Sequence, residues 1–327
     1  MKAFFNLIRW QNLLIVVLTM ILIRYALLEP VLGKLTVTLN EGSGAEVPVT
    51  LQFSLFNFIL LVLATVFITA GGYVINDYFD IRTDLINKGS VIVGTRIERR
   101  QAMMLHNIFN IAGVALGFYI SWRSGYFLAG MLFLVVSGLL YFYSASYKRQ
   151  FLLGNIVVAV LTGMVPLLVG FYEWPALYRY YSVNAVNPPD FDFIFYWIGG
   201  FAFFAFLTTL TREIIKDIED FEGDVAYGRN TLPVVLGIKT AKIIASFLNL
   251  ITIALLYIIW HLFLYDNYTL VYISAVLALP LFLVIFIVFR STDRKRMHSA
   301  SRLMKIVMLG GILYSLVVKA LLTWNLI

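Results

Sequence analysis

Residues 54–84 read SLFNFILLVLATVFITAGGYVINDYFDIRTD, an apolar run that leads into a short segment with three aspartates. A run of about 18 or more apolar residues is long enough to cross ~30 Å of hydrocarbon. Hydrocarbon offers no partners for backbone N–H and C=O groups, so a run of this kind is expected to form a helix. The stretch therefore predicts a membrane-spanning helix with an acidic end.

Similar apolar runs recur along the chain of 327 residues, of which 61% are hydrophobic and 13% charged. Hydropathy and breaks in charge indicate about nine spans. Their expected limits are 11–29, 54–75, 102–122, 125–145, 152–171, 193–211, 243–263, 268–289 and 302–323. The sequence predicts an all-α, polytopic membrane protein that forms a single domain over residues 1–327.

Two polar connections are expected on the same face of the membrane. Residues 34–53, KLTVTLNEGSGAEVPVTLQF, alternate apolar and polar side chains around Gly-Ser-Gly, which predicts an exposed β-hairpin. Residues 172–192 are expected to form the second polar connection.

The basic residues predict the orientation of the chain. A formal charge of +7 could suggest a nucleic-acid partner, but the distribution of Lys and Arg favours membrane topology instead. Twenty of these residues fall on one face and five on the other, and cytoplasmic loops are the ones that carry such an excess. We expect an integral protein of the inner cell membrane, with a cytoplasmic N-terminus, an external hairpin, an external C-terminus and no nucleic-acid partner.

The acidic residues gather in two segments that come directly after the second and sixth spans. Half of the 18 acidic residues lie there, and both segments contain the spacing D-x-x-D-x-x-x-D. The six aspartates are Asp77, Asp80, Asp84, Asp217, Asp220 and Asp224. Steps of three and four residues place the members of each set on one helical face, and both faces are expected on the cytoplasmic side.

Three like charges on one face are stable when a cation lies between them. Carboxylate oxygens are hard ligands suited to Mg²⁺, which typically bridges one or two carboxylates to phosphate oxygens. The sequence thus predicts a magnesium site in a central cavity that opens to the cytoplasmic side. A cation transporter could also use repeated acids, although its acids should lie nearer the middle of the membrane.

Basic and polar residues near the acids are candidates for binding a diphosphate, because they can neutralise its non-bridging oxygens. The basic residues are Arg82, Lys148, Arg149, Arg212 and Lys216, whereas Asn76 offers a neutral ligand or a hydrogen bond. The histidines, His106, His261 and His298, stand apart from both acidic segments in the sequence and are predicted to be structural or interfacial. The chain has no cysteine, which excludes disulfides, thiol catalysis and cysteine-ligated metals.

The segments NDYFDIRTD and DIEDFEGD resemble the UbiA superfamily of intramembrane prenyltransferases. That family carries Asn-Asp-x-x-Asp-x-x-x-Asp after the second span and Asp-x-x-Asp-x-x-x-Asp after the sixth, and both are matched in full. RWQN, which contains Arg9 and Asn12, and YSASYKR, which contains Tyr143, Ser144 and Lys148, resemble further family features. With the span count, the resemblance covers essentially the whole chain.

The resemblance implies a reaction. Two Mg²⁺ ions, held by the aspartate clusters, bind the diphosphate of a polyprenyl donor and stabilise it as the C1–O bond breaks. A lipid or aromatic acceptor captures the allylic cation. The implied catalytic residues are Asp77, Asp80, Asp217 and Asp220, and the implied metal ligands are Asn76, Asp77, Asp80, Asp84, Asp217, Asp220 and Asp224.

The residues after the first motif indicate the acceptor. Aromatic-prenylating relatives often continue into Asn-Lys-Pro-x-Arg-Pro, whereas NKGSVIVGTRIERRQA keeps Asn87 and Lys88 but lacks the Arg-Pro element. RWQNLL, VIVG and KDIEDFEGD look more like the geranylgeranylglycerol-phosphate geranylgeranyltransferase branch, whose acceptor is a glycerol ether hydroxyl. The alternative is an aromatic acid of quinone biosynthesis, 4-hydroxybenzoate or 1,4-dihydroxy-2-naphthoate.

The connection 89–100 joins two spans on the predicted cytoplasmic face and could fold over the site as a lid. Guanidinium groups pair bidentately with phosphate oxygens. Arg96 and Arg99 are therefore predicted to bind the phosphate of the acceptor, and Lys88 is a further substrate-binding candidate.

Overall fold

The computed structural model describes residues 1–40, 46–291 and 293–324, without the side chain of Lys88. Within this part of the chain, nine helices are long and apolar enough to span a membrane. They cover Trp10–Leu32, Leu55–Phe79, Arg99–Arg123, Phe127–Arg149, Leu153–Asn184, Phe193–Glu219, Ile238–Leu264, Asn267–Arg290 and Arg294–Thr323. The predicted all-α membrane fold with nine spans is confirmed.

Several spans consist of more than one helical segment, because π-type turns (η1, η4, η5) or 3₁₀ turns (η2, η3) adjoin the α-helices. The elements are α1 (Lys2–Leu7), α2 (Trp10–Leu22), η1 (Ile23–Leu28), α3 (Glu29–Leu32), β1 (Thr36–Thr38), β2 (Glu46–Pro48), α4 (Leu55–Phe79), α5 (Ile81–Lys88), α6 (Arg99–Arg123), η2 (Phe127–Gly130), α7 (Met131–Ala145), η3 (Tyr147–Arg149), α8 (Leu153–Asn184), α9 (Phe193–Glu219), α10 (Phe221–Ala226), α11 (Leu232–Leu236), α12 (Ile238–Ile259), η4 (Trp260–Leu264), α13 (Asn267–Tyr272), η5 (Ile273–Ala278), α14 (Leu279–Arg290) and α15 (Arg294–Thr323).

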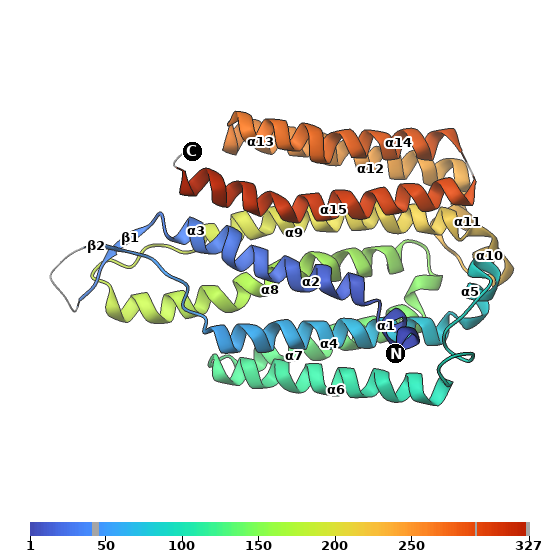
Figure 1. The fold of residues 1–327 in the computed structure, drawn as a ribbon, viewed down its shortest axis with the longest axis horizontal. Helices are drawn as coiled ribbons and strands as arrows, with labels where there is room; N and C mark the ends of the chain where they lie inside the picture. Colours follow the sequence, from blue (N-terminus) through green and yellow to red (C-terminus); the bar gives the residue numbers. More distant parts are fainter. Residues whose placement is uncertain (41–45, 292, 325–327) are drawn as a thin grey trace.

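The long helices run side by side along the longest axis of the molecule (Figure 1). Helix α4 packs on α6, and α9 packs on both α8 and α15. The short helices α5, α10 and α11 lie at one end of this bundle, and the strands β1 and β2 lie at the opposite end (Figure 1). The two acidic segments and the hairpin are therefore separated by the length of the spans.

Helix α8 is longer than its apolar run. The sequence predicts a span over 152–171 and a polar connection over 172–192, but the helix continues to Asn184. Tyr172, Leu177 and Tyr181 are buried on the continued part, so packing extends the helix beyond the residues that are apolar enough to be recognised. The first part of the predicted polar connection is thus wrong.

The hairpin segment forms two short antiparallel strands. Thr36 pairs with Pro48 and Thr38 with Glu46, and the backbone after β1 also pairs with the end of α8 through Leu39 and Ala185. The predicted turn of the hairpin, at residues 41–45, lies outside the described residues.

A buried ion pair ties the hairpin end of the bundle together. Arg24, on η1, and Glu173, on α8, are 3% and 0% exposed, and Arg24 Nη2 lies 3.6 Å from Glu173 Oε2. Glu173 Oε1 accepts hydrogen bonds from the backbone N–H groups of Gln52, at 2.6 Å, and Phe53, at 2.9 Å. Arg24 donates to the carbonyl oxygen of Phe53. Three separate segments therefore depend on this pair.

Replacing Glu173 with alanine is expected to lower the free energy of unfolding by about 3–5 kcal/mol, because it leaves the buried guanidinium of Arg24 without its counter-charge. Reversible unfolding in mixed micelles measures this change. Glu29→Ala is the matched control, since Glu29 pairs with Lys319 at 3.5 Å on the surface and such pairs contribute about 1 kcal/mol or less. Equal effects of the two substitutions would contradict the structural role of the buried pair.

Candidate active site

One cavity of about 960 Å³ lies among the helices. Its wall is charged and polar around the two acidic segments, and all six aspartates of the repeated motif line it. Farther from the acids the wall is largely apolar. The apolar lining residues are Ile15, Val16, Ile68, Leu132, Phe133, Val136, Leu140, Val158, Leu161, Met164, Val165, Leu168 and Met308. A cavity of this kind suits a ligand with an anionic head and a hydrocarbon tail.

The two acidic motifs have the same local structure. Each begins in the last turn of a long helix, bends at its middle aspartate and ends in a short helix. Asp80, with φ −91° and ψ 2°, separates α4 from α5, and Asp220, with φ −96° and ψ 9°, separates α9 from α10. The spacing predicted that each motif lies on one continuous helix. In the structure each motif is instead divided between two helices.

Hydrogen bonds of helical type nevertheless run through both bends. Asp80 N–H donates to Asn76 O at 3.0 Å, and Asp84 N–H donates to Asp80 O at 2.8 Å. The second motif has the equivalent bonds. Asp220 N–H donates to Lys216 O at 2.8 Å, and Asp224 N–H donates to Asp220 O at 3.1 Å. The spacing of three and four residues thus keeps each set of carboxylates on the cavity side although the helix changes direction.

Asn87 joins the short helices of the two motifs. Its Oδ1 accepts the backbone N–H of Gly223 at 3.1 Å, and its Nδ2 donates to Asp220 O at 3.4 Å. A Cβ atom on Gly223 would lie 2.4 Å from Asn87 Oδ1, so only glycine allows this approach. The contact holds α5 against α10.

Basic side chains contact the aspartates of both motifs. Arg9 Nη2 lies 2.8 Å from Asp77 Oδ1. Asp80 Oδ1 lies 2.8 Å from Lys148 Nζ and 2.6 Å from Arg229 Nη2, and the other end of the Arg229 guanidinium lies 3.3 Å from Asp224 Oδ1. Arg229 therefore bridges the two motifs.

These contacts change the acidity of the carboxyl groups outside the spans. Burial acts to raise the pKa of Asp80, but the charges of Lys148 and Arg229 outweigh it and lower this pKa to about 2. Burial raises the pKa of Asp224 to about 6, against the opposing charge of Arg229. Asp80 is therefore held as a carboxylate at any physiological pH.

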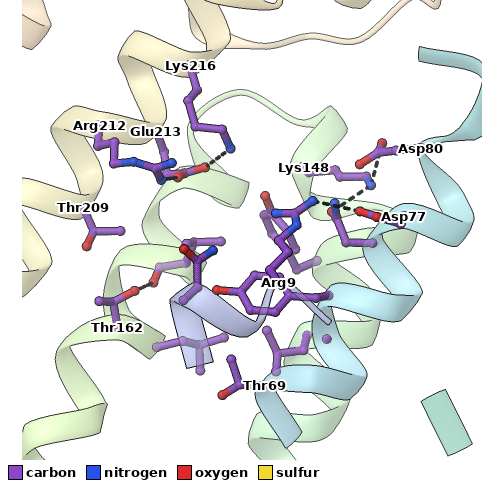
Figure 2. A pocket seen from close by; sticks show the side chains of 18 of the residues that line it. Arg9, Thr69, Asp77, Asp80, Lys148, Thr162, Thr209, Arg212, Glu213 and Lys216 are labelled. Carbon is purple, nitrogen blue, oxygen red and sulfur yellow. Dashed lines mark hydrogen bonds and ion pairs between the residues drawn. The ribbon is translucent and has the colours of Figure 1, made fainter. Parts of the chain in front are cut away.

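The second motif and the residues before it form the facing wall. Asn155 Nδ2 donates to Asp217 Oδ2 at 2.8 Å. Figure 2 shows Arg212, Glu213 and Lys216 together on α9, across the cavity from Asp77, Asp80 and Lys148, with Arg9 between the two groups. Charged residues from distant parts of the sequence thus lie at one site. Arg9 and Asp77, for example, are 68 positions apart.

Most of the predicted substrate-binding residues line the cavity. They are Asn12, Asn76, Tyr143, Lys148, Arg212 and Lys216. Lys148 Nζ also lies 3.2 Å from Asn76 Oδ1, so the family feature after the fourth span contacts the start of the first motif. The side chain of Lys88, a further candidate, lies outside the described part of the structure.

Arg82, Arg96 and Arg99 were predicted to bind substrate, but their exposed side chains are not among the residues that line the cavity. The connection that precedes α6 folds on itself at Gly94, which has φ +89°, and Gly94 N–H donates to Ile97 O at 2.8 Å. Its apolar residues turn inward, as Val93 at 1% exposure shows, so its arginines point out. Ile92 is the residue of this connection that lines the cavity, and binding of the acceptor phosphate by Arg96 and Arg99 stays a prediction.

The sequence also gave several lining residues no substrate- or metal-binding role, although Arg9 was noted in RWQN and His298 was predicted to be structural or interfacial. These lining residues are Arg9, Glu213, Arg229, Arg294, Lys295, His298 and Lys305. His298 is not isolated from the acids, because its Nδ1 lies 2.7 Å from Glu219 Oε1. Arg229, five residues after Asp224, could have been noted from its closeness to the second motif, whereas no local signal marks Lys305.

The donor set of the cavity fits Mg²⁺ by its chemistry, since six carboxylates and the amide of Asn76 supply hard oxygen ligands around one cavity. Asp77, Asp80, Asp220 and Asp224 contact cations, and Asp217 accepts a hydrogen bond from the amide of Asn155. In the described residues no three acidic or histidine side chains are grouped around a common point. The cations that neutralise them here are Arg9, Lys148, Arg229 and Arg294.

The fold and this cavity define an integral membrane protein with one acid- and cation-lined site at the end of its helix bundle. The profile of the UbiA prenyltransferase family matches residues 44–309. The chain belongs to this family and is a prenyltransferase.

Curated relatives and solved structures agree with the family. Digeranylgeranylglyceryl phosphate synthase of Methanosphaera stadtmanae is 31% identical over 78% of this chain and 85% of its own length. The protein of the same name from Methanobrevibacter smithii is 35% identical over 77% and 83%. A UbiA homologue from Archaeoglobus fulgidus, solved with GPP and Mg²⁺, has a TM-score of 0.55 at 16% identity and covers 96% of this chain and 99% of its own. The last likeness concerns the fold.

Proposed function

We propose that this prenyltransferase transfers a geranylgeranyl group from its diphosphate to the hydroxyl of a geranylgeranylglyceryl phosphate. The observation that carries the proposal is the name of the relatives, digeranylgeranylglyceryl phosphate synthase, at 31% and 35% identity over more than three quarters of the chain. The name describes a product with two such groups on one glyceryl phosphate. The acceptor would then already carry one group and contribute its remaining hydroxyl.

In this reaction the C1–O bond of the donor breaks and the diphosphate leaves with the electron pair. The acceptor oxygen forms the new C–O bond and passes its proton to the released diphosphate. We infer that Asn76 and the six aspartates hold two Mg²⁺ ions, which when bound would neutralise the departing diphosphate. Lys148 and Arg229, which both contact Asp80, would stabilise the same charge, and the apolar wall would take the prenyl chain.

We infer that one domain carries this activity, because the residues that line the cavity come from Asn6 to Met308. We also infer that the acidic end faces the cytoplasm. Twenty of the 25 basic residues belong to that end by the predicted topology, and such an excess is typical of cytoplasmic loops. An odd number of spans would then place the C-terminus outside, together with the hairpin.

The proposal is tested with the purified protein, geranylgeranyl diphosphate, Mg²⁺ and a panel of acceptors. The expected result is a doubly prenylated glyceryl phosphate and one diphosphate released per ether bond formed. The panel includes 4-hydroxybenzoate and 1,4-dihydroxy-2-naphthoate, because an aromatic acceptor is the alternative. Efficient prenylation of either compound without turnover of the glyceryl phosphate would reject the proposed acceptor and leave the family assignment intact.

A further inference from the structure

Two groups of cations lie on different walls of the cavity, and Arg9 lies between them. Lys148 and Arg229 contact Asp80 on the wall of the first motif. A second group is formed by Arg212, Glu213 and Lys216 of α9 with Lys305 of α15, and we refer to these four residues as the Glu213 cluster. Figure 2 shows the α9 members of the Glu213 cluster across the cavity from Asp77 and Asp80.

The Glu213 cluster has more cationic than anionic groups. Glu213 Oε1 lies 2.6 Å from Arg212 Nη1 and Glu213 Oε2 lies 3.0 Å from Lys216 Nζ, so one carboxylate is shared by two cations. Arg212 Nε is buried and donates to no atom of the described residues. The three cations and one carboxylate of the Glu213 cluster give it a net charge of +2, with Asp217 next to Lys216 on α9.

Lys305 adds a positive charge for which the structure shows no acidic partner among the described contacts. Its Nζ lies 3.4 Å from Asn12 Oδ1, a neutral partner on α2. Arg212, Lys216 and Arg9 repel it electrostatically, and Glu213 attracts it. A half-buried ammonium among like charges is unfavourable unless an anion joins it, so the arrangement indicates a site for a ligand with about two negative charges.

A phosphate monoester fits this requirement, because it carries about −1.5 to −2 charge at neutral pH. The face of α15 also fits the rest of such a ligand. Ser301, Lys305 and Met308 follow one another along that face at steps of four and three residues, and all three line the cavity. The wall therefore changes from cationic to apolar within one helical turn beyond Lys305.

We propose that the Glu213 cluster binds the phosphate monoester of the acceptor, with Lys305 as the residue that distinguishes a phosphorylated acceptor from its alcohol. This rests on the proposed function, which supplies an acceptor with a phosphate. The donor diphosphate would lie between the two aspartate motifs, of which the first faces the Glu213 cluster and the second follows it on α9. The acceptor is thus held by α9 and α15, and the arginines of the connection between α5 and α6 take no part.

The test compares two ligands and three variants in detergent micelles without donor. The ligands are geranylgeranylglyceryl phosphate and the same ether without its phosphate, and the measurement is the Kd of each by titration calorimetry. The variants are Lys305→Met, Lys305→Arg and, as a matched control, Arg302→Met. Arg302 is exposed on the same helix and is not among the residues that line the cavity.

Lys305→Met is expected to weaken binding of the phosphate ether roughly 10- to 100-fold, as for the loss of a charged hydrogen bond. Binding of the alcohol stays unchanged, which also shows that the variant is folded. Lys305→Arg retains most of the preference for the phosphate, and Arg302→Met retains all of it. In turnover, Lys305→Met raises KM for the phosphate ether by a similar factor and leaves KM for geranylgeranyl diphosphate within about twofold.

Two kinds of result would overturn the inference, one in binding and one in turnover. One is a wild-type protein that binds the phosphate ether no tighter than the alcohol, or a Lys305→Met variant that keeps the wild-type preference. The other is an equal rise of KM for donor and acceptor, which would assign the Glu213 cluster to the donor diphosphate. Because binding is measured without donor, failure of the proposed reaction is seen separately, as absence of product from the wild-type protein.

Discussion

Replacement of Asp77 or Asp220 with asparagine is expected to lower kcat by about 10²- to 10³-fold, while the protein stays folded. Each aspartate lines the same cavity from a different motif. A carboxylate that holds a metal ion against the leaving diphosphate acts mainly as charge develops in the transition state, and loss of one such contact costs about 10²–10³ in kcat. Asparagine keeps the shape of the side chain and removes its charge.

The matched control is Glu222→Gln. Glu222 belongs to the second acidic segment but is exposed and is not among the residues that line the cavity. We expect its kcat to stay within about twofold of the wild-type value, as for surface substitutions away from the site. We would measure kcat by steady-state kinetics with geranylgeranyl diphosphate. An unfolding midpoint for each variant shows that it is folded. If all three variants have similar kcat, the aspartates are not part of the catalytic site.

Removal of divalent metal is expected to abolish turnover. A diphosphate would meet six carboxylates in this cavity, and carboxylates and phosphates repel each other unless a cation bridges them. Activity is measured after dialysis against EDTA and again after addition of Mg²⁺ or Mn²⁺, both of which suit oxygen ligands. Activity should return with either ion. Undiminished turnover in chelator would show that the basic residues alone stabilise the leaving group.

The bends at Asp80 and Asp220 explain how the two aspartate motifs line one cavity at the end of two long helices. Each middle aspartate lies where the chain leaves a membrane-spanning helix for a short one. The short helices α5 and α10 then meet through Asn87 and Gly223. Since Arg229 also connects Asp80 with Asp224, the two motifs are held together by contacts outside the spans.

The sequence alone determined the membrane fold and the composition of the acidic motifs. The thickness of the hydrocarbon sets a minimum length for each apolar run, so the nine spans could be located from hydropathy. A spacing of three and four residues fixes side chains to one face of a helix, which allowed the six aspartates to be named. Both motifs could be matched to one family because each motif is a short run of consecutive residues.

Only the tertiary structure decided which charges meet. Arg9 reaches Asp77 across 68 positions, Arg229 reaches Asp80 across 149, and Lys305 reaches Asn12 across 293. Arg96 and Arg99, which are much nearer to the first motif in the sequence, are exposed and lie outside the set of cavity residues. Local patterns do not encode such distant contacts. They arise when the helices pack, because burial then leaves each charge only the partners that neighbouring helices bring to it.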